Sequence, residues 1–281
     1  KALAGHLDFE VPPAFTSTHA DEAFNAARKV VSEQAAERLA IQAAGLNHFT
    51  WMLALHDRET GEDLYPRFRE RWAELPEEFE PLTRRLFQIF DLFPLPGDEH
   101  LCEYLPWVSD PRTKPWEKFD LSLYDWDRRA EMRDEGYEVI ARMVAGEHSV
   151  DALRLVDSEG ALEMIASVAG AGSHYHLAVN LPNEGFISNL PAGAIVEVPG
   201  VVTGAGVQGV VVGPLPEPIA ELCRREITVA QLGIDAAVLG DRQAALQCLL
   251  LDPVITDLDV AQNVLEDYLV TYRDLLPQFG A

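Results

Sequence analysis

The pattern of apolar and polar positions begins with segments of helical character. Residues 22–44 are rich in Ala, Glu, Arg and Gln, which predicts a helix that ends near Gly45. Residues 46–55 are mainly apolar, and this run fits a buried strand or a helix-to-strand transition. Apolar residues then recur at helical spacing over 63–91, and residues 128–145 also read as a helix. The first half of the chain is therefore predicted to be largely helical.

Short strands follow, and helices return at the end of the chain. Strands are predicted over 174–183, 195–199 and 207–212. Helices are predicted again over 217–251, with a break near Gly240, and over 257–276. Because helices and strands are grouped rather than alternating, we predict an α+β fold with a small mixed or antiparallel sheet. No repeat or linker interrupts the sequence, so residues 1–281 are expected to form a single domain.

Composition and charge narrow the range of partners. The chain has 46 acidic and 22 basic residues, a net charge of −24, which repels phosphate backbones and anionic lipid headgroups. We therefore expect neither nucleic acid nor a membrane as a partner. The three cysteines form no Cys-x-x-Cys pair, which argues against a disulfide scaffold or a thiolate zinc site and favours the cytoplasm. The sequence has no initiator Met and no Gly-rich phosphate-binding loop, which suggests a piece of a longer protein.

The first candidate for chemistry is the pair Asn47-His48 in the apolar run. The imidazole of His48 is a suitable ligand for Mn, Fe, Ni, Co or Zn, and the amide of Asn47 can hold a substrate hydroxyl. A hydrogen-bonded core histidine is the alternative. The pair alone leaves both interpretations open.

A second candidate lies between residues 98 and 104. His100 and Glu103 are three residues apart, so on a helix they share a face and can clamp a cation. Asp98 follows a glycine in a turn, where a carboxylate can project into a cleft as a general base. The alternative is an acidic helix start that is exposed to solvent and favoured by the helix dipole.

Two further groups of polar residues are ambiguous. The segment 180–191 contains three asparagines, Asn183 among them, and two prolines, which predicts a rigid polar turn. Its amides can bind a ligand or satisfy loop backbone groups. His174 and His176 share one face of a predicted strand, but no third ligand is evident nearby, and we favour a structural role for them.

The order of these weak motifs is more specific than any one of them. Residues 45–51, Gly-Leu-Asn-His-Phe-Thr-Trp, resemble the Gly-Ile-Asn-His-x-x-Trp motif of family-4 glycoside hydrolases. Residues 97–104 resemble the Gly-Asp-x-His-x-x-Glu-Tyr segment of the glucosidase, galactosidase and uronidase branches of that family. Further landmarks are similar at residues 180–191, 196–199, 213–216 and 249–253. The resemblance covers residues of about 45–280 in the family's order.

The resemblance implies a fold and a reaction. The chain would correspond to the C-terminal domain, which is similar to that of lactate and malate dehydrogenases, while the NAD-binding Rossmann domain is absent. The implied reaction transfers a hydride from C3 of the sugar to NAD, removes the C2 proton and eliminates the C1 leaving group. Water then adds, and NADH returns its hydride. Family 4 is an exception to the paired-carboxylate scheme of other glycosidases. A divalent metal, with Mn²⁺ as the first candidate, would chelate O2 and O3 and polarise the ketone.

The resemblance also implies roles for individual residues. His48 occupies the metal-histidine position, and Asp98 occupies the position of the C2 base. That base is a tyrosine in the 6-phospho-sugar branch, so an aspartate argues against this branch. Asn47, His100 and Asn183 are implied to bind or support the substrate. The family's metal-binding cysteine and its acid would lie before residue 1, so we expect the chain alone to be inactive.

Partners follow from the same resemblance, and rival functions remain open. We expect a small sugar glycoside as substrate and a homodimer or homotetramer, in which the irregular segment 105–120 forms part of the interface. One rival is a stand-alone binding or assembly module. Another is a metal hydrolase that uses His48, His100, Glu103 and the His174/His176 pair without NAD. A hydroxy-acid dehydrogenase would require an Arg-His pair for a carboxylate, and no such motif is evident.

Overall fold

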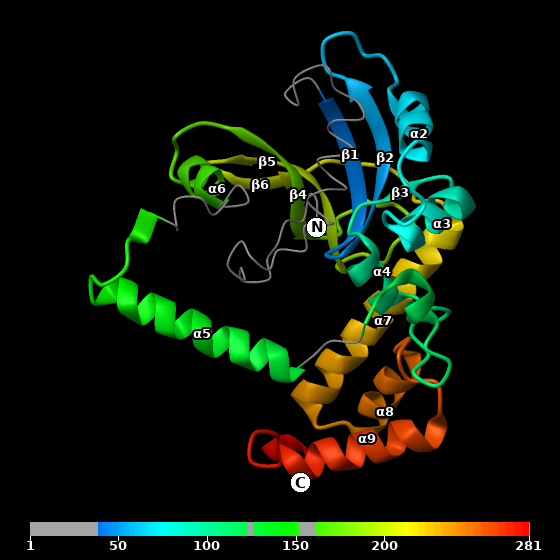
Figure 1. Cartoon of the computed structure of the whole chain (residues 1–281), viewed down its shortest axis with the longest axis vertical. Helices are drawn as coiled ribbons and strands as arrows, with labels where there is room; N and C mark the ends of the chain where they lie inside the picture. The colour runs from blue at the N-terminus through cyan, green and yellow to red at the C-terminus, as the bar shows by residue number, and fades with distance from the viewer. Residues whose placement is uncertain (1–38, 123–125, 152–160, 281) are drawn as a thin grey trace.

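A small antiparallel sheet lies at the centre of the fold. A computed structural model describes residues 39–122, 126–151 and 161–280 of the chain (Figure 1). The strands are β1 (Leu39–Leu46), β2 (Phe49–Asp57), β3 (Phe93–Pro94), β4 (His174–Pro182), β5 (Ile195–Thr203) and β6 (Gly206–Gly209). Their order is β3-β2-β1-β5-β4, and β6 pairs with β5. All these pairings are antiparallel, so the predicted α+β fold with a small sheet is confirmed.

Helices surround this sheet and extend beyond it. They are α2 (Tyr65–Ala73), α3 (Pro81–Phe90), α4 (Asp98–Tyr104), α5 (Trp126–Val144), α6 (Ala161–Val168), α7 (Glu217–Leu239), α8 (Arg242–Leu251) and α9 (Leu258–Thr271). Two short 3₁₀ helices, η2 (Pro115–Phe119) and η4 (Pro277–Phe279), complete the described elements. The predicted break near Gly240 separates α7 from α8. Gly240 has a φ of 69°, the left-handed conformation that ends many helices, and the carboxylate of Asp241 caps α8.

The helix predicted over 22–44 is wrong for its last six residues. The structure places Leu39–Leu46 in strand β1, and the rest of the predicted helix lies outside the described residues. Local helix propensity fails here because β1 pairs with β2 along its whole length and buries Ala43 and Ala44. The segment 63–91 is also divided into two helices, since Pro81 begins α3 after a short connection.

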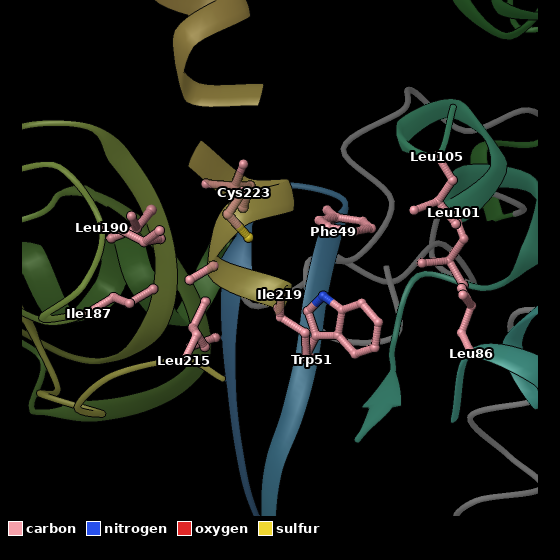
Figure 2. Close-up of a cluster of buried hydrophobic side chains, with 14 of the residues drawn as sticks. Phe49, Trp51, Leu86, Leu101, Leu105, Ile187, Leu190, Leu215, Ile219 and Cys223 are labelled. Atoms are coloured by element: carbon pink, nitrogen blue, oxygen red, sulfur yellow. The ribbon is translucent and has the colours of Figure 1, made fainter. Parts of the chain in front are cut away.

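Two apolar clusters hold the elements together. In the larger cluster, Figure 2 shows Phe49 and Trp51 of β2 between helix α7 on one side and helix α4 on the other. Cys223 and Ile219 project from α7 toward these rings, and Leu101 faces them from α4. The smaller cluster packs α2 and α3 against strands β1, β2 and β3, with side chains that include Phe68, Trp72 and Phe93. Large apolar side chains of this kind stabilise a fold by about 1.5–3 kcal/mol each when fully buried.

The core fixes two features that matter for function. Phe49 is fully buried directly after the β1–β2 turn, and Leu101 is fully buried in α4. The turn and the first part of α4 are therefore held against the same core.

Helix α5 is different, because it has no buried residue and projects away from the sheet in Figure 1. Within the ranges that the structure describes, no helix has the length and apolar character that crossing a membrane requires.

Candidate functional site

The candidate site begins at the tight turn between β1 and β2. The last paired residues of the two strands are Leu46 and Phe49, so Asn47 and His48 form a two-residue turn. His48 has a φ of 134°, which is rare for a residue with a side chain, and its backbone N–H donates to the carbonyl of Leu46 over 2.6 Å. Before the turn, a Cβ added to Gly45 would lie 2.3 Å from the carbonyl oxygen of Phe49. The hairpin therefore presents Asn47 and His48 together in a constrained conformation.

Helix α4 brings a second histidine to this turn. The ring centroids of His48 and His100 are 5.2 Å apart. His100 Nδ1 lies 3.3 Å from Glu103 Oε2, as the three-residue spacing predicts. One turn further, the Tyr104 hydroxyl donates to the backbone carbonyl of Asn47 over 3.4 Å. One face of α4 thus covers the turn with an imidazole, a carboxylate and a phenol.

A buried glutamate in β5 lies beneath the turn. The Asn47 side chain donates from Nδ2 to Glu197 Oε2 over 3.4 Å, and Glu197 is only 1% exposed. Burial raises the pKa of the Glu197 carboxyl to about 7, although the side chains of Asn47, Asn180 and Thr50 oppose this shift. Glu197 was not among the residues predicted from the sequence. The available signal was a single acidic residue within the apolar strand Ile-Val-Glu-Val.

Asp98 lies on the other side of α4 from His100. Positions i and i+2 of a helix are separated by about 200° around its axis, so the side chains of Asp98 and His100 point in nearly opposite directions. The carboxylate of Asp98 accepts the backbone N–H groups of Leu82 and Thr83 over 2.8 and 2.6 Å, and the residue is 6% exposed. In return, Glu80 Oε2 accepts the backbone N–H of Asp98 over 2.7 Å. This geometry favours a helix-capping role over the base role that the resemblance implies.

The two capping carboxyls influence each other electrostatically. Burial, followed by the negative charge of Asp98, raises the pKa of Glu80 to about 8. The proximity of Asp98 therefore favours the protonated form of Glu80, which still accepts the N–H of Asp98. The arrangement fixes where α4 begins and so fixes the position of His100.

Asn183 organises its own loop. Its Nδ2 donates to the carbonyls of Ile187, Leu190 and Pro191 over 3.0 to 3.2 Å. Its Oδ1 accepts the backbone N–H groups of Gly185 and Ile187 over 3.2 and 3.1 Å. The side chain is 2% exposed, and both ends of its amide are occupied. The predicted substrate role of Asn183 receives no support from this geometry.

The histidines offer an incomplete donor set for a metal. His174 and His176 lie in β4, opposite Val202 and Gly200 of β5. In the part of the chain that the structure describes, no group of three or more His, Cys, Asp or Glu side chains is arranged to hold a metal ion. A metal bound at His48 would therefore need further ligands from outside the described residues.

Comparison with known proteins identifies the family. Residues 43–255 match the model of the family 4 glycosyl hydrolase C-terminal domain, which is most of the chain. The chain belongs to glycoside hydrolase family 4. This membership confirms the resemblance of the Asn47-His48 and 97–104 motifs, both of which lie within the matched region.

Named relatives within family 4 are sugar hydrolases. An α-galacturonidase of Bacillus subtilis is 30% identical over 271 residues, which covers 86% of this chain and 58% of that protein. An α-galactosidase of the same species is 26% identical and covers 84% of this chain and 55% of that protein. The chain thus spans little more than half the length of the curated relatives that it matches.

Solved structures of the family share the fold. The crystal structure of lplD from Bacillus subtilis, described as a glucosidase, superposes with a TM-score of 0.69 at 27% identity, covering 90% of this chain and 62% of that one. A 6-phospho-α-glucosidase from gut microorganisms, solved in complex with NAD and Mn²⁺, gives a TM-score of 0.64 at 24% identity and covers 90% and 59% of the two chains. This second likeness concerns the fold alone.

Proposed function

We propose that the protein containing this chain is a glycosidase that depends on NAD and a divalent metal, and that the β1–β2 turn forms part of its sugar site. The proposal rests on one observation in a chain of family 4: the turn residues Asn47 and His48 lie against helix α4, where His48 is beside His100. Relatives named as glycosidases, and a neighbouring structure that contains NAD and Mn²⁺, support it.

The cofactors would supply the redox step. NAD, when bound, provides the acceptor for a hydride from C3 of the sugar, and a divalent cation such as Mn²⁺ provides a positive charge that makes the C2 proton easier to remove. Loss of that proton would be followed by departure of the C1 substituent, addition of water and return of the hydride from NADH to C3, so that the net reaction is a hydrolysis. Within the described ranges only His48 and His100 offer clustered imidazoles at the turn, and they do not complete a metal site.

The residues of this chain would bind and orient the sugar. The amide of Asn47 can both donate to and accept from sugar hydroxyls, and His100 can donate from the ring nitrogen that does not face Glu103. His48 is the proposed metal ligand. Asp98 remains the proposed C2 base on the ground of motif position alone, because its carboxylate is engaged at the start of α3.

The substrate class follows from the relatives and from the 97–104 motif. We propose an unphosphorylated α-glycoside, with an α-galacturonide as the first candidate, since an α-galacturonidase is the relative at 30% identity. An aspartate rather than a tyrosine at position 98 agrees with this choice. An α-galactoside is the second candidate, because relatives at 26% identity are α-galactosidases.

The test uses the full-length protein with NAD and Mn²⁺ and a panel of nitrophenyl α-galacturonide, α-galactoside and α-glucoside. Hydrolysis in D₂O is expected to place deuterium at C2 of the released sugar. H48A is expected to abolish turnover, whereas H174A, which changes an exposed histidine on β4, is expected to leave it unchanged. Turnover without deuterium at C2 would contradict the proposed reaction.

A separate arm tests the metal-hydrolase rival. The chain of 281 residues is assayed with Mn²⁺ or Zn²⁺ and no nucleotide. Our proposal predicts no turnover, because one or two imidazoles do not hold a metal firmly. Turnover that is lost in H174A or H176A would favour a hydrolase that uses these histidines.

A further inference from the structure

A row of residues crosses four strands directly below the β1–β2 turn. Gly45 of β1 is opposite Thr50 of β2 on one side and opposite Glu197 of β5 on the other. Glu197 is in turn opposite Asn180 of β4. Residues directly opposite each other in antiparallel strands place their side chains on the same face of the sheet. Because Gly45 contributes no side chain, the carboxyl of Glu197 can reach across it toward β2.

The carboxyl of Glu197 contacts the turn through Asn47. Its Oε2 accepts the N–H of Asn47 Nδ2 over 3.4 Å, and the side chains of Asn180 and Thr50, from the same row, also lower its pKa. The neighbouring residues Val196 and Val198 are fully buried. Burying a carboxyl costs free energy unless hydrogen bonds offset the loss of water, so its contacts with neighbouring amides and hydroxyls matter.

The contact determines which way the amide of Asn47 points. An amide has an acceptor end and a donor end, and the lone pairs of Glu197 Oε2 select the donor end. Asn47 Oδ1 is therefore turned away from the sheet. The backbone of Asn47 is held as well, because the Tyr104 hydroxyl donates to its carbonyl. Burial raises the pKa of the Glu197 carboxyl to about 7, and the residue is only 1% exposed.

We propose that Glu197 is a positioning residue for the glycosidase site, which orients the Asn47 amide so that Oδ1 accepts a hydroxyl of the bound sugar. The inference rests on the proposed function. Glu197 is too deeply buried to touch the sugar and acts through Asn47. The role requires an acceptor at position 197 and does not require a charge.

The first experiment separates the acceptor from the charge. In the full-length protein with NAD and Mn²⁺, E197Q keeps an acceptor oxygen and is expected to leave KM for nitrophenyl α-galacturonide within about twofold. E197M has a similar volume without an acceptor and is expected to raise KM about tenfold, which corresponds to ~1.4 kcal/mol. The Kd of galacturonic acid, measured by titration calorimetry, should rise by a similar factor. If E197M leaves both KM and Kd unchanged, Glu197 has no positioning role.

A double-mutant cycle tests whether the effect passes through Asn47. N47A alone should raise KM, and E197M should add nothing further in the N47A background. Full additivity of the two substitutions would overturn the inference. A reciprocal exchange covers the case in which E197M does not fold. N47D places a second carboxylate against that of Glu197, two acceptors without a donor, and should raise KM. Adding E197Q to N47D restores a donor and should lower KM part of the way back. No recovery would also overturn the inference.

The matched control is V202A, which removes core contacts from the same strand. It should lower Tm without changing KM. If V202A raises KM as much as E197M does, the effect of E197M reflects general damage to β5 and the inference fails. The assay also includes the unsubstituted protein. If the unsubstituted protein is active and E197M has the same KM and Kd, only the role of Glu197 is refuted. If the unsubstituted protein is inactive, the proposed function is refuted together with the inference.

Discussion

Glu80 and Asp98 cap the beginnings of each other's helices. Asp98 accepts the first free N–H groups of α3, and Glu80, the residue before α3, accepts the N–H of Asp98 at the start of α4. The pair therefore ties two helix starts together across 18 residues of sequence. Free N–H groups at a helix start need acceptors, and carboxyl oxygens are favoured there by the helix dipole. This exchange orients α4, whose opposite face carries His100.

Stability should depend on pH through Glu80. Its pKa is raised from 4.5 to about 8, so the folded state binds a proton more tightly than the unfolded state does. This contribution to stability is complete below pH 4.5 and is lost as the pH rises toward about 8. Because one proton is involved, the free energy of unfolding changes by at most ~1.4 kcal/mol per pH unit.

The comparison of wild type with E80Q measures this effect. The Tm of wild type minus that of E80Q should fall between pH 5 and pH 8, because the glutamine does not titrate. Glu197 titrates in both proteins, so its contribution cancels from the difference. Parallel Tm curves over this range would show that Glu80 has an ordinary pKa.

D98N should separate the capping role of Asp98 from a role as base. If the carboxylate only caps α3, the asparagine side chain in D98N keeps one acceptor oxygen and turns its NH₂ group toward the second backbone N–H. The free energy of unfolding should then fall by about 1–2 kcal/mol. The value of kcat would then change by less than about tenfold below the lowered Tm. A base in the reaction would instead lower kcat by roughly 10²–10⁴-fold. Chemical denaturation and kcat for the same preparation decide between the two roles.

G45A should destabilise the fold strongly. The added Cβ would lie 2.3 Å from Phe49 O, and the φ of 155° is itself unfavourable for alanine. We expect a loss of more than about 2 kcal/mol, since strain at one residue alone costs of order 1–3 kcal/mol.

G61A is the matched control for G45A. Gly61 also has a positive φ, of 74°, but an added Cβ there would meet no atom within 4 Å. G61A should therefore lower the free energy of unfolding by only about 1 kcal/mol, the cost of the left-handed conformation for alanine. Equal losses in urea unfolding would mean that β1 can move away from Phe49.

N183A should affect folding rather than sugar binding. It removes five hydrogen bonds within the 183–191 loop and leaves buried backbone groups without partners, so we expect a loss of about 2–4 kcal/mol. KM for the best nitrophenyl glycoside should stay within about twofold once folded protein is assayed. A large rise in KM with unchanged Tm would restore the substrate role that the sequence suggested.

Much of the fold could be predicted because the pattern is local. Grouped helices and strands indicated the α+β class, and the three-residue spacing of His100 and Glu103 placed them on one helix face. The resemblance assigned Asn47, His48 and His100 to one site, and the turn and helix α4 do lie side by side. These features depend on short-range periodicity or on motif order.

The remaining features depend on contacts between distant residues. Three of the eight residues of β1 are alanines, and it is the pairing with β2 and β5 that makes it a strand. The engagement of Asp98 becomes visible only when Glu80 and the start of α3 are placed beside it. Glu197 becomes notable only after the register sets it opposite Gly45. Local sequence patterns contain none of these relationships.

Helix α5 has an energetic consequence of its own. None of its 19 residues is buried, so its ordering is coupled only weakly to the sheet and the two apolar clusters. An isolated helix of this length is marginally stable in water. Its amide hydrogens should therefore exchange with solvent through local opening, long before those of β1, β2 and β5, which open only when the whole fold does. We therefore expect α5 to melt and re-form while the sheet stays folded.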